Sequence, residues 1–192
     1  MCGKLTTIAC ALPLLFLAAD AHATSIDFGG NTYFLTATAE NWDQAEAEAV
    51  AAGGHLASIH NSADDELLAN TFLTGAPLWI GLADPDQNSI FTWTDGSALD
   101  FTDWHSGEPN DANGSEHYTA LGWHYSQGSS SDMGDWNDTP LAGSSGYGGG
   151  TDGPYFGIIE VADAPEPASL GLGVFGFAAL GFGALKRRYA NR

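Results

Sequence analysis

Three acidic side chains lie close together in the segment Trp104–Tyr118, whose sequence is WHSGEPNDANGSEHY. Glu108, Asp111 and Glu116 have no Lys or Arg beside them in this segment. Carboxylates this close repel one another, so a cation is the expected partner. Calcium takes six to eight oxygen ligands, mainly from carboxylates, amide carbonyls and water. The segment therefore predicts a divalent-metal site with calcium as the ion.

A second short motif adds oxygen donors of the same kind. Asn137 and Asp138 follow Trp136 in the sequence WND. Together with the first segment they supply three carboxylates and two amides, which suit one calcium ion in type and number. The candidate metal ligands are Glu108, Asn110, Glu116, Asn137 and Asp138.

Catalytic and zinc sites find less support in the same region. His105, His117 and His124 are the histidines of this stretch, but no Cys/His set and no HExxH motif accompanies them. Ser129–Ser131 lies near Asp132, but the G-x-S-x-G sequence of a nucleophile elbow is absent. We therefore expect a protein that is not an enzyme, and a metal-dependent hydrolase is the alternative that turnover of polysaccharides would reveal.

The charge distribution supports a cationic ligand. All five Lys and Arg residues lie in the two terminal segments, whereas residues 24–163 contain 22 Asp and Glu and no Lys or Arg. Phosphate groups would be repelled, so we expect no nucleic acid and no anionic lipid as a partner of this region. Divalent cations are the natural partners, and an acidic, solubilising surface is the alternative interpretation for most of these side chains.

The N-terminal segment, residues 1–23, has the features of a secretory signal peptide. Lys4 precedes an apolar run, and Ala21–Ala23 fits the small-x-small cleavage pattern. A buried N-terminal helix is the alternative. Cys2 and Cys10 both lie in this segment, so the exported protein would contain no cysteine.

The C-terminal segment, residues 164–192, has the features of a membrane anchor. The 18 residues 168–185 are apolar and rich in glycine, and as a helix they would span ~27 Å, enough to cross a bilayer core. A cluster of basic residues follows and should stay cytoplasmic. With Pro165-Glu166-Pro167 before it, the segment resembles a PEP-CTERM sorting tail. The resemblance implies processing by an exosortase-type enzyme and placement at the cell surface or in the extracellular matrix.

The elements that must position the ligands lie between these two ends, in residues 24–163. Asn41 with Gln44 forms a predicted capping box for a first helix, which Gly53-Gly54 ends. A second helix should begin near Ser62, with Asp65 in the box position. It would bury Leu67, Leu68 and Phe72. Short strands are predicted at Thr32–Thr36, Leu78–Leu82, Phe91–Thr94 and Phe156–Val161, with little regular structure over Asp95–Tyr155.

The order of these motifs resembles that of a C-type lectin-like domain over residues 32–161. The resemblance implies an α+β fold with two helices, a small antiparallel sheet and a long calcium-binding loop region. The resemblance rests on the segment Asn41–Ile59, which contains the first predicted helix, and on WIGL (Trp79–Leu82), the stretch Phe91–Trp104, EPN, WND and the closing FGIIE.

The resemblance also assigns a role to the candidate ligands. In the family, the Glu and Asn of EPN, a later Glu, and the Asn and Asp of WND hold one calcium ion, to which two vicinal sugar hydroxyls bind directly. Glu108, Asn110, Glu116, Asn137 and Asp138 would thus bind calcium and carbohydrate together. The EPN sequence implies mannose-, glucose- or fucose-type sugars, and it implies a cis peptide bond before Pro109.

This chain departs from the family pattern at two sets of positions. The usual disulfide positions correspond to Ala49, Tyr118, Leu141 and Ile159, so apolar packing would replace both bridges. An auxiliary calcium site would correspond to Asp84, Asn88, Asp111 and His117, of which Asn88 and His117 stand where carboxylates are common.

The sequence as a whole predicts an exported, calcium-dependent carbohydrate-binding protein with polysaccharide as its partner, exopolysaccharide being a natural one. A structural or protein-binding module in which calcium only orders the loop is the alternative. Trp42, Trp79 and Trp93 are expected in the core. Trp104, Trp123 and Trp136 are the candidates for stacking on a sugar ring.

Overall fold

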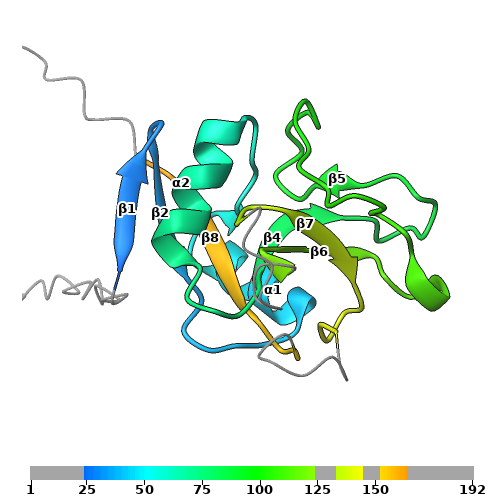
Figure 1. Cartoon of the computed structure of the whole chain (residues 1–192). Helices are drawn as coiled ribbons and strands as arrows, with labels where there is room; N and C mark the ends of the chain where they lie inside the picture. Colours follow the sequence, from blue (N-terminus) through cyan, green and yellow to red (C-terminus); the bar gives the residue numbers. More distant parts are fainter. Residues whose placement is uncertain (1–23, 124–132, 145–151, 164–192) are drawn as a thin grey trace, which may run out of the picture. The chain divides into compact units, whose positions relative to one another are not determined.

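The computed structural model in Figure 1 describes residues 24–123, 133–144 and 152–163. The predicted signal peptide, the predicted sorting tail and the membrane helix 168–185 all lie outside these residues. The described residues up to Ala162 belong to one compact unit, which contains every helix and strand given below. Among the described residues, no helix is both long and apolar enough to cross a membrane.

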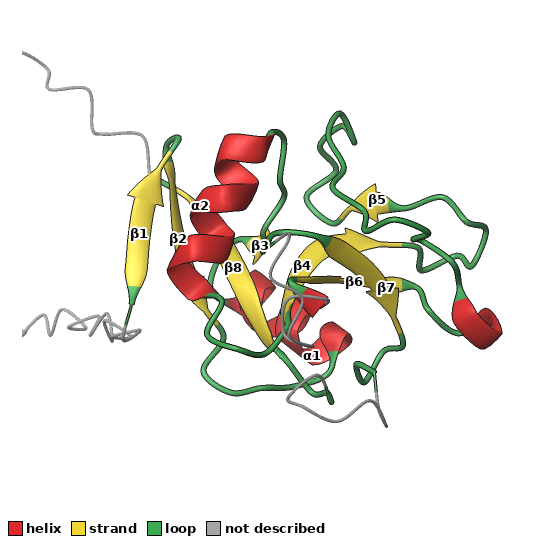
Figure 2. Cartoon of the chain, viewed as in Figure 1, coloured by secondary structure: helices red, strands yellow, loops and turns green. Residues whose placement is uncertain are grey.

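The described strands form one sheet in the order β1-β2-β8-β4-β6-β7, with β3 paired to β8 and β5 paired to β4. Figure 2 shows the strands, the two helices and the loops that join them. The strands are β1 (Ser25–Phe28), β2 (Asn31–Leu35), β3 (His55–Leu56), β4 (Leu78–Ala83), β5 (Thr92–Trp93), β6 (Tyr118–Leu121), β7 (Trp136–Thr139) and β8 (Phe156–Ala162).

The sheet is mixed, which corrects the expectation of an antiparallel one. β4 and β8 run parallel, with Leu78 opposite Phe156 and Trp79 opposite Gly157, whereas the other strand pairs are antiparallel. Parallel neighbours need a long connection between them. Here the chain passes through β5, β6 and β7 before it returns as β8, so the whole candidate ligand region lies within that connection.

The first helix, α1 (Trp42–Ala51), begins as the sequence predicts. The side chain of Asn41 accepts a hydrogen bond from the Gln44 N–H at 2.9 Å, and the Gln44 side chain accepts one from the Asn41 N–H at 3.3 Å. This capping box satisfies two N–H groups that the helix itself cannot pair. Trp42, Ala45 and Ala49 are buried on one face of the helix, and they attach it to the sheet.

The second helix, α2 (Ser62–Phe72), differs from the prediction at its cap. Asn61, not Ser62, is the N-cap, and its Oδ1 accepts hydrogen bonds of 3.0 Å from the Ala63 and Asp64 N–H groups. Asp65 therefore does not take part in a capping box, and it is buried instead. Leu68 and Phe72 are buried as predicted, but Leu67 is 40% exposed.

Two strands, β6 and β7, lie in the region predicted to have little regular structure. Thr119 pairs with Asp138 and Ala120 with Asn137, so the WND motif is part of a strand. The polar residues of β7 hide its strand character from a hydrophobic pattern. Although WNDT lacks an apolar alternation, all four of its residues are buried.

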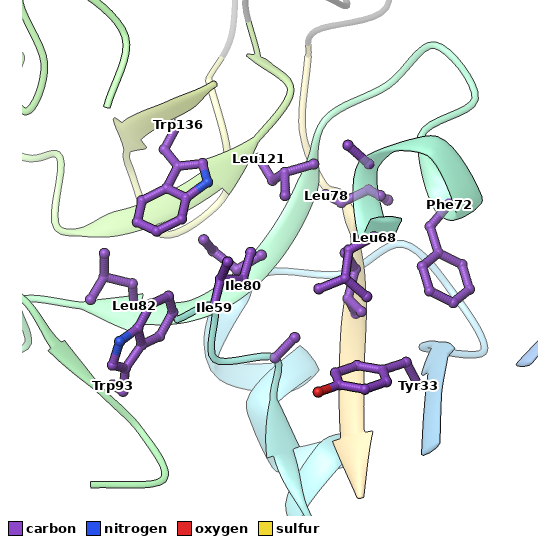
Figure 3. Packing of buried hydrophobic residues seen from close by; sticks show 13 residues of the cluster. Tyr33, Ile59, Leu68, Phe72, Leu78, Ile80, Leu82, Trp93, Leu121 and Trp136 are labelled. Atoms are coloured by element: carbon purple, nitrogen blue, oxygen red, sulfur yellow. The ribbon is translucent and has the colours of Figure 1, made fainter. Parts of the chain in front are cut away.

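Two hydrophobic clusters hold the sheet and helices together. Figure 3 shows the first, in which Trp93, Trp136, Leu82 and Ile80 come from β4, β5 and β7. The second contains Trp42 and Trp79. All four positions at which disulfides were expected in relatives belong to this second cluster or pack against it: Ala49, Tyr118, Leu141 and Ile159. The core positions predicted for Trp42, Trp79 and Trp93 are confirmed.

Candidate metal centre

Trp136 fixes the start of the strand that carries the WND motif. Its side chain is fully buried, and its Nε1 donates a hydrogen bond of 2.8 Å to Oδ1 of Asp65 on α2. The rings of Trp93, Phe101 and Trp104 meet its indole edge-to-face at centroid distances of 5.7–5.9 Å. These contacts hold β7 rigidly against the core, so the residues that follow Trp136 have fixed positions.

Backbone hydrogen bonds bring the EPN segment to the same strand. The Trp136 N–H donates to the Asp103 carbonyl at 2.8 Å, and the His105 N–H donates to the Trp136 carbonyl at 2.9 Å. A turn follows, in which the Glu108 N–H donates to the His105 carbonyl at 2.9 Å. The Glu108–Pro109 peptide bond is cis, which confirms the implied conformation.

Asp138 lies at the centre of the candidate site. Its side chain is fully buried, and its two oxygens accept hydrogen bonds from the N–H groups of Asn110 (3.1 Å) and Asp111 (2.7 Å). A buried carboxylate needs such donors because water does not reach it. The strand residue Asp138 thus holds the EPN segment in place, 28 residues earlier in the chain.

A short turn places Glu116 beside Asp138. The helical turn η1 (Ala112–Gly114) follows Asp111, whose Oδ1 accepts a hydrogen bond of 3.1 Å from the Glu116 N–H. In return, Oε2 of Glu116 accepts one of 2.9 Å from the Ala112 N–H. This reciprocal pair closes the loop and points the Glu116 carboxylate back toward the EPN segment.

Glu108, Glu116 and Asp138 are close enough to affect one another's ionisation. Burial, then the charge of Asp138, a hydrogen bond with Asp138 and the charge of Glu116 raise the pKa of Glu108 to about 7, against a smaller opposing effect of His105. Burial also raises the pKa of Glu116, with a contribution from the charge of Asp138. Bringing three carboxylates together in this way is unfavourable unless a cation or a proton neutralises them.

The two amides of the predicted set have different surroundings. The side chain of Asn110 is exposed, and only its backbone N–H contacts Asp138. Asn137 is buried, and its Nδ2 donates a hydrogen bond of 2.5 Å to the main-chain oxygen of Asp138. The structure therefore gathers the three carboxylates, with Asn137 next to Asp138 in the strand and Asn110 joined to Asp138 by its backbone N–H.

The carboxylate oxygens do not converge on one point. Across residues 24–123, 133–144 and 152–163, no group of three or more His, Cys, Asp or Glu side chains is arranged to hold a metal ion. The reason is visible in the hydrogen bonds above, because Asp138 and Glu116 direct their oxygens at backbone N–H groups. A cation at this place would compete with those N–H groups for the same oxygens.

One oxygen of the site is free to take a cation. Oε2 of Glu108 is inaccessible to solvent and has no hydrogen-bond partner among the described residues. A buried carboxylate oxygen without a donor is unfavourable, and a metal ion would relieve it. The donor types and this unsatisfied oxygen therefore fit a hard divalent cation such as calcium.

Three of the four predicted auxiliary residues lie around an adjoining hollow of about 320 Å³, which includes space open to solvent. Asp84, Asp111 and His117 line it, whereas Asn88 does not. The Oδ1 of Asn88 accepts a hydrogen bond of 2.9 Å from the Ile90 N–H. Glu116 and Asp138 of the main candidate set line it too. Sequence reasoning did not identify four further lining residues: Gln87, Ser89, Phe91 and Pro109.

A histidine–aspartate pair beside the site was also missed. Nδ1 of His105 makes a short hydrogen bond with Oδ2 of Asp135, which is buried. Asp135 directly precedes the WND motif, but no signal in the sequence pairs it with a residue 30 positions earlier. Nδ1 of His117 lies 3.9 Å from Oδ2 of Asp84. His124 lies outside the described residues.

Two of the three tryptophans predicted as sugar-stacking candidates are buried. Trp136 is fully buried and Trp123 is only 8% exposed, so neither offers a ring face to a ligand. That prediction is wrong for both residues, because the core takes up their rings. Trp104 is partly exposed and packs against Phe91 at a centroid distance of 5.1 Å, and its stacking role stays a prediction.

Comparison with known proteins gives one consistent family. Residues 38–142 match the model of the lectin C-type domain. The chain is 36% identical over 100 residues to ladderlectin of Oncorhynchus mykiss, covering 50% of this chain and 53% of that protein. It is 33% identical over 150 residues to a C-type lectin of Micrurus corallinus, and this match covers 72% of this chain and 91% of that protein. The chain thus spans about half of ladderlectin, and only 7% of human C-type mannose receptor 2.

Solved structures support the same fold. One is the cow C-type carbohydrate-recognition domain of CD23, in the presence of GlcNAc2Man3 oligosaccharide. It has a TM-score of 0.58 and 26% identity, with coverage of 73% of this chain and 95% of that one. Another is a calcium-independent type II antifreeze protein, also with a TM-score of 0.58 and 26% identity. The match covers 74% of this chain and 94% of that one. The sequence match, the α+β fold with its mixed sheet and these structural neighbours agree, and the chain belongs to the C-type lectin domain family.

Proposed function

We propose that this protein binds carbohydrate through a calcium ion held by Glu108, Asn110, Glu116, Asn137 and Asp138. The observation that carries the proposal is the gathering of three carboxylates, Glu108, Glu116 and Asp138, in a region of 140 residues without Lys or Arg. Such a cluster is unfavourable unless a cation or a proton neutralises it, and a cation can do so without protonating the ligands. The family to which the chain belongs, and the CD23 structure solved in the presence of an oligosaccharide, make carbohydrate the ligand class of choice.

The chain's own residues have separate tasks in this proposal. Asp138 positions the EPN segment by accepting the Asn110 and Asp111 N–H groups, and Glu108 contributes its unsatisfied Oε2. Bound calcium would supply coordination positions for two vicinal hydroxyls of a sugar. The exposed Asn110 amide and the carboxylates can hydrogen-bond those same hydroxyls, which selects sugars by stereochemistry. The EPN sequence favours mannose-, glucose- or fucose-type residues.

The hollow beside this site supports an auxiliary calcium ion as a secondary part of the proposal. Asp84 and Asp111 line the hollow, and Glu116 borders both places. Asp84 already accepts hydrogen bonds from the Asn88 and Ser89 N–H groups, at 3.1 and 2.7 Å. An ion here would share Glu116 with the first ion, while Asn88 would have to turn from its bond with Ile90 to contribute.

The protein would act outside the cell, on a polysaccharide. This rests on the signal-peptide pattern of residues 1–23 and the sorting-tail pattern of residues 164–192 in the sequence. Membrane attachment through residues 168–185, processing by an exosortase-type enzyme and recognition of exopolysaccharide belong to the same proposal. The family is in general one of non-catalytic domains, which agrees with a binding function for this chain.

The second candidate function is a structural or protein-binding module. The similarity to a calcium-independent type II antifreeze protein favours it, because the name of that protein gives this fold a function other than sugar binding. In that case calcium would only order the loop, and free mannose would not displace the partner.

Calcium titration calorimetry on the purified full chain tests the proposal, followed by mannose titration with calcium present. We expect saturable calcium binding with a Kd of about 10⁻⁴–10⁻³ M, as in extracellular modules. Asp138→Asn should abolish it, because the ion loses a carboxylate, whereas Asp86→Asn at an exposed position should not. Equal calcium affinity in the wild type and Asp138→Asn would refute the site, and calcium binding without mannose binding would favour the second candidate.

A further inference from the structure

The hollow beside the proposed calcium site has a strongly one-sided charge. Four of its lining side chains are carboxylates, namely Asp84, Asp111, Glu116 and Asp138. Its other lining residues include His117 but no Lys or Arg. Since residues 24–163 contain no Lys or Arg at all, no such side chain of the domain can swing in from a neighbouring loop.

The histidines do not supply the missing positive charge. Each of the four histidines in the described part of the chain lies within ion-pair distance of its own carboxylate. The pairs are His55–Glu46 (2.6 Å), His60–Asp100 (2.8 Å), His105–Asp135 and His117–Asp84 (3.9 Å). A protonated imidazole at any of these places would first neutralise the protein's own carboxylate, so it would leave no surplus for an anionic ligand.

Bound calcium does not reverse this balance. At the proposed main site, the three carboxylates carry one more negative charge than one calcium ion carries positive. If a second ion occupied the auxiliary place, Asp84 and Asp111 would join the count, and five carboxylates would still exceed two ions by one charge. The rim adds the exposed Asp86, next to the lining residue Gln87.

We propose that the carbohydrate site is selective for uncharged polysaccharides and rejects polymers that carry sulfate or carboxylate groups. The inference rests on the proposed carbohydrate function and adds the class of polymer. An uncharged chain needs only vicinal hydroxyls and hydrogen bonds, which the site offers. An anionic chain would bring like charges within a few ångström of carboxylates whose total negative charge exceeds the positive charge of the bound calcium.

The size of the effect follows from the distances involved. Two like unit charges about 4 Å apart repel each other even in water, and more strongly near a protein surface. A few such contacts amount to a difference of about tenfold or more in affinity. The repulsion is screened by salt, with a Debye length of about 30 Å at 0.01 M and about 3 Å at 1 M ionic strength. Selectivity of this origin should therefore be large in dilute buffer and nearly vanish in concentrated salt.

The test compares two ligands that differ only in charge. An α-mannan oligosaccharide and the same oligosaccharide with sparse sulfate groups, which leave most vicinal hydroxyls free, are titrated into the full chain with saturating calcium. At about 0.01 M ionic strength, we expect the sulfated ligand to bind about tenfold more weakly, or worse. At about 1 M, the two affinities should approach each other.

Two matched charge reversals locate the source of the selectivity. Asp86→Lys places a positive charge at the rim, whereas Glu66→Lys makes the same charge change on α2, which lies apart from the loop of η1 in Figure 1. At about 0.1 M ionic strength, where the Debye length is about 10 Å, only Asp86→Lys, which lies near the hollow, should change the affinity for the sulfated ligand. We expect Asp86→Lys to improve binding of the sulfated ligand about threefold or more, with the uncharged ligand unaffected. Glu66→Lys should change neither the affinity for the sulfated ligand nor that for the uncharged one.

The outcomes separate this inference from the function on which it rests. Sulfated and uncharged ligands that bind equally at low salt would overturn the selectivity while leaving carbohydrate binding intact. Equal effects of Asp86→Lys and Glu66→Lys would overturn its local origin. If neither ligand binds at any salt concentration although calcium does, the carbohydrate function fails and the inference fails with it.

Discussion

The indole Nε1 of Trp136 donates a hydrogen bond of 2.8 Å to Oδ1 of Asp65, 71 residues earlier in the chain. Both side chains are buried, and the bond joins helix α2 to the first residue of β7. The ligand candidates Asn137 and Asp138 follow directly on that strand. A helix far from the site in sequence therefore determines where the central carboxylate lies.

Removal of the Asp65 carboxylate should destabilise the fold. Asp65→Ala leaves the buried Trp136 N–H without an acceptor, which we expect to lower the free energy of unfolding by about 2–3 kcal/mol. The matched control is Glu66→Ala, its exposed neighbour on α2, which should change stability by less than about 0.5 kcal/mol. Urea denaturation measures both, and equal stabilities of the two variants would contradict the role given to the bond.

Gly134 should be needed for the approach of the chain to Asp65. A Cβ at this position would lie 2.0 Å from Asp65 Oδ2, so Gly134→Ala must displace one of the two segments. We expect a loss of about 1–3 kcal/mol in the free energy of unfolding, as for other overpacked sites. In an Asp65→Ala background the same substitution should cost less, because the clashing oxygen is gone. A double-mutant cycle by urea denaturation reveals this coupling, and strict additivity would argue against it.

Much of the fold could be predicted because its signals are local. The Asn41–Gln44 capping box, the stop at Gly53-Gly54 and the apolar strand β4 depend on neighbours within a few residues. The order of motifs was enough to predict the α+β C-type lectin fold, and the family match and the structural neighbours confirm it.

The features that were missed depend on contacts between distant segments. β7 has a polar sequence, and it is buried only because Trp136 is held by Asp65 and by three aromatic rings. The parallel pairing of β4 with β8 and the His105–Asp135 pair likewise join segments that no local pattern connects. For the same reason, Trp123 and Trp136 could be mistaken for exposed loop residues.

The stability of the calcium-free protein should fall as the pH rises. Burial and the neighbouring Asp138 raise the pKa of Glu108 to about 7, so the folded protein binds this proton more tightly than the unfolded chain does. The stability linked to Glu108 is therefore fully present below its ordinary pKa of 4.5, and it is lost as the pH rises through about 7. Thermal unfolding in chelator between about pH 5 and 8 should show this fall.

Glu108→Gln provides the control for this pH dependence. The amide stays neutral throughout, so the variant should lose part of the decline, while burial of Glu116 and Glu160 leaves the rest. Calcium should act in the opposite direction in the wild type, because its binding releases the proton and is favoured at higher pH. Identical pH profiles for the wild type and Glu108→Gln would contradict the assignment to Glu108.

Removal of calcium should expose the EPN loop to proteolysis while the helices stay protected. Trypsin has no site in residues 24–163, which lack Lys and Arg, so a glutamate-specific protease is the informative reagent. It can cut after Glu116 in the loop, whereas the bond after Glu108 is resistant because Pro109 follows it. Glu66 in α2 provides an internal control. In chelator the three carboxylates repel one another and strain the hydrogen bonds from Asn110 and Asp111 to Asp138, so the loop opens more often. We expect cleavage after Glu116 to accelerate about tenfold, which corresponds to about 1.4 kcal/mol of lost local stability. Cleavage at Glu66 should not change, because α2 is capped by Asn61 and held to β7 through Asp65. If calcium and chelator give the same cleavage rate in the loop, the carboxylates are balanced without calcium, and the ion has no part in ordering this region.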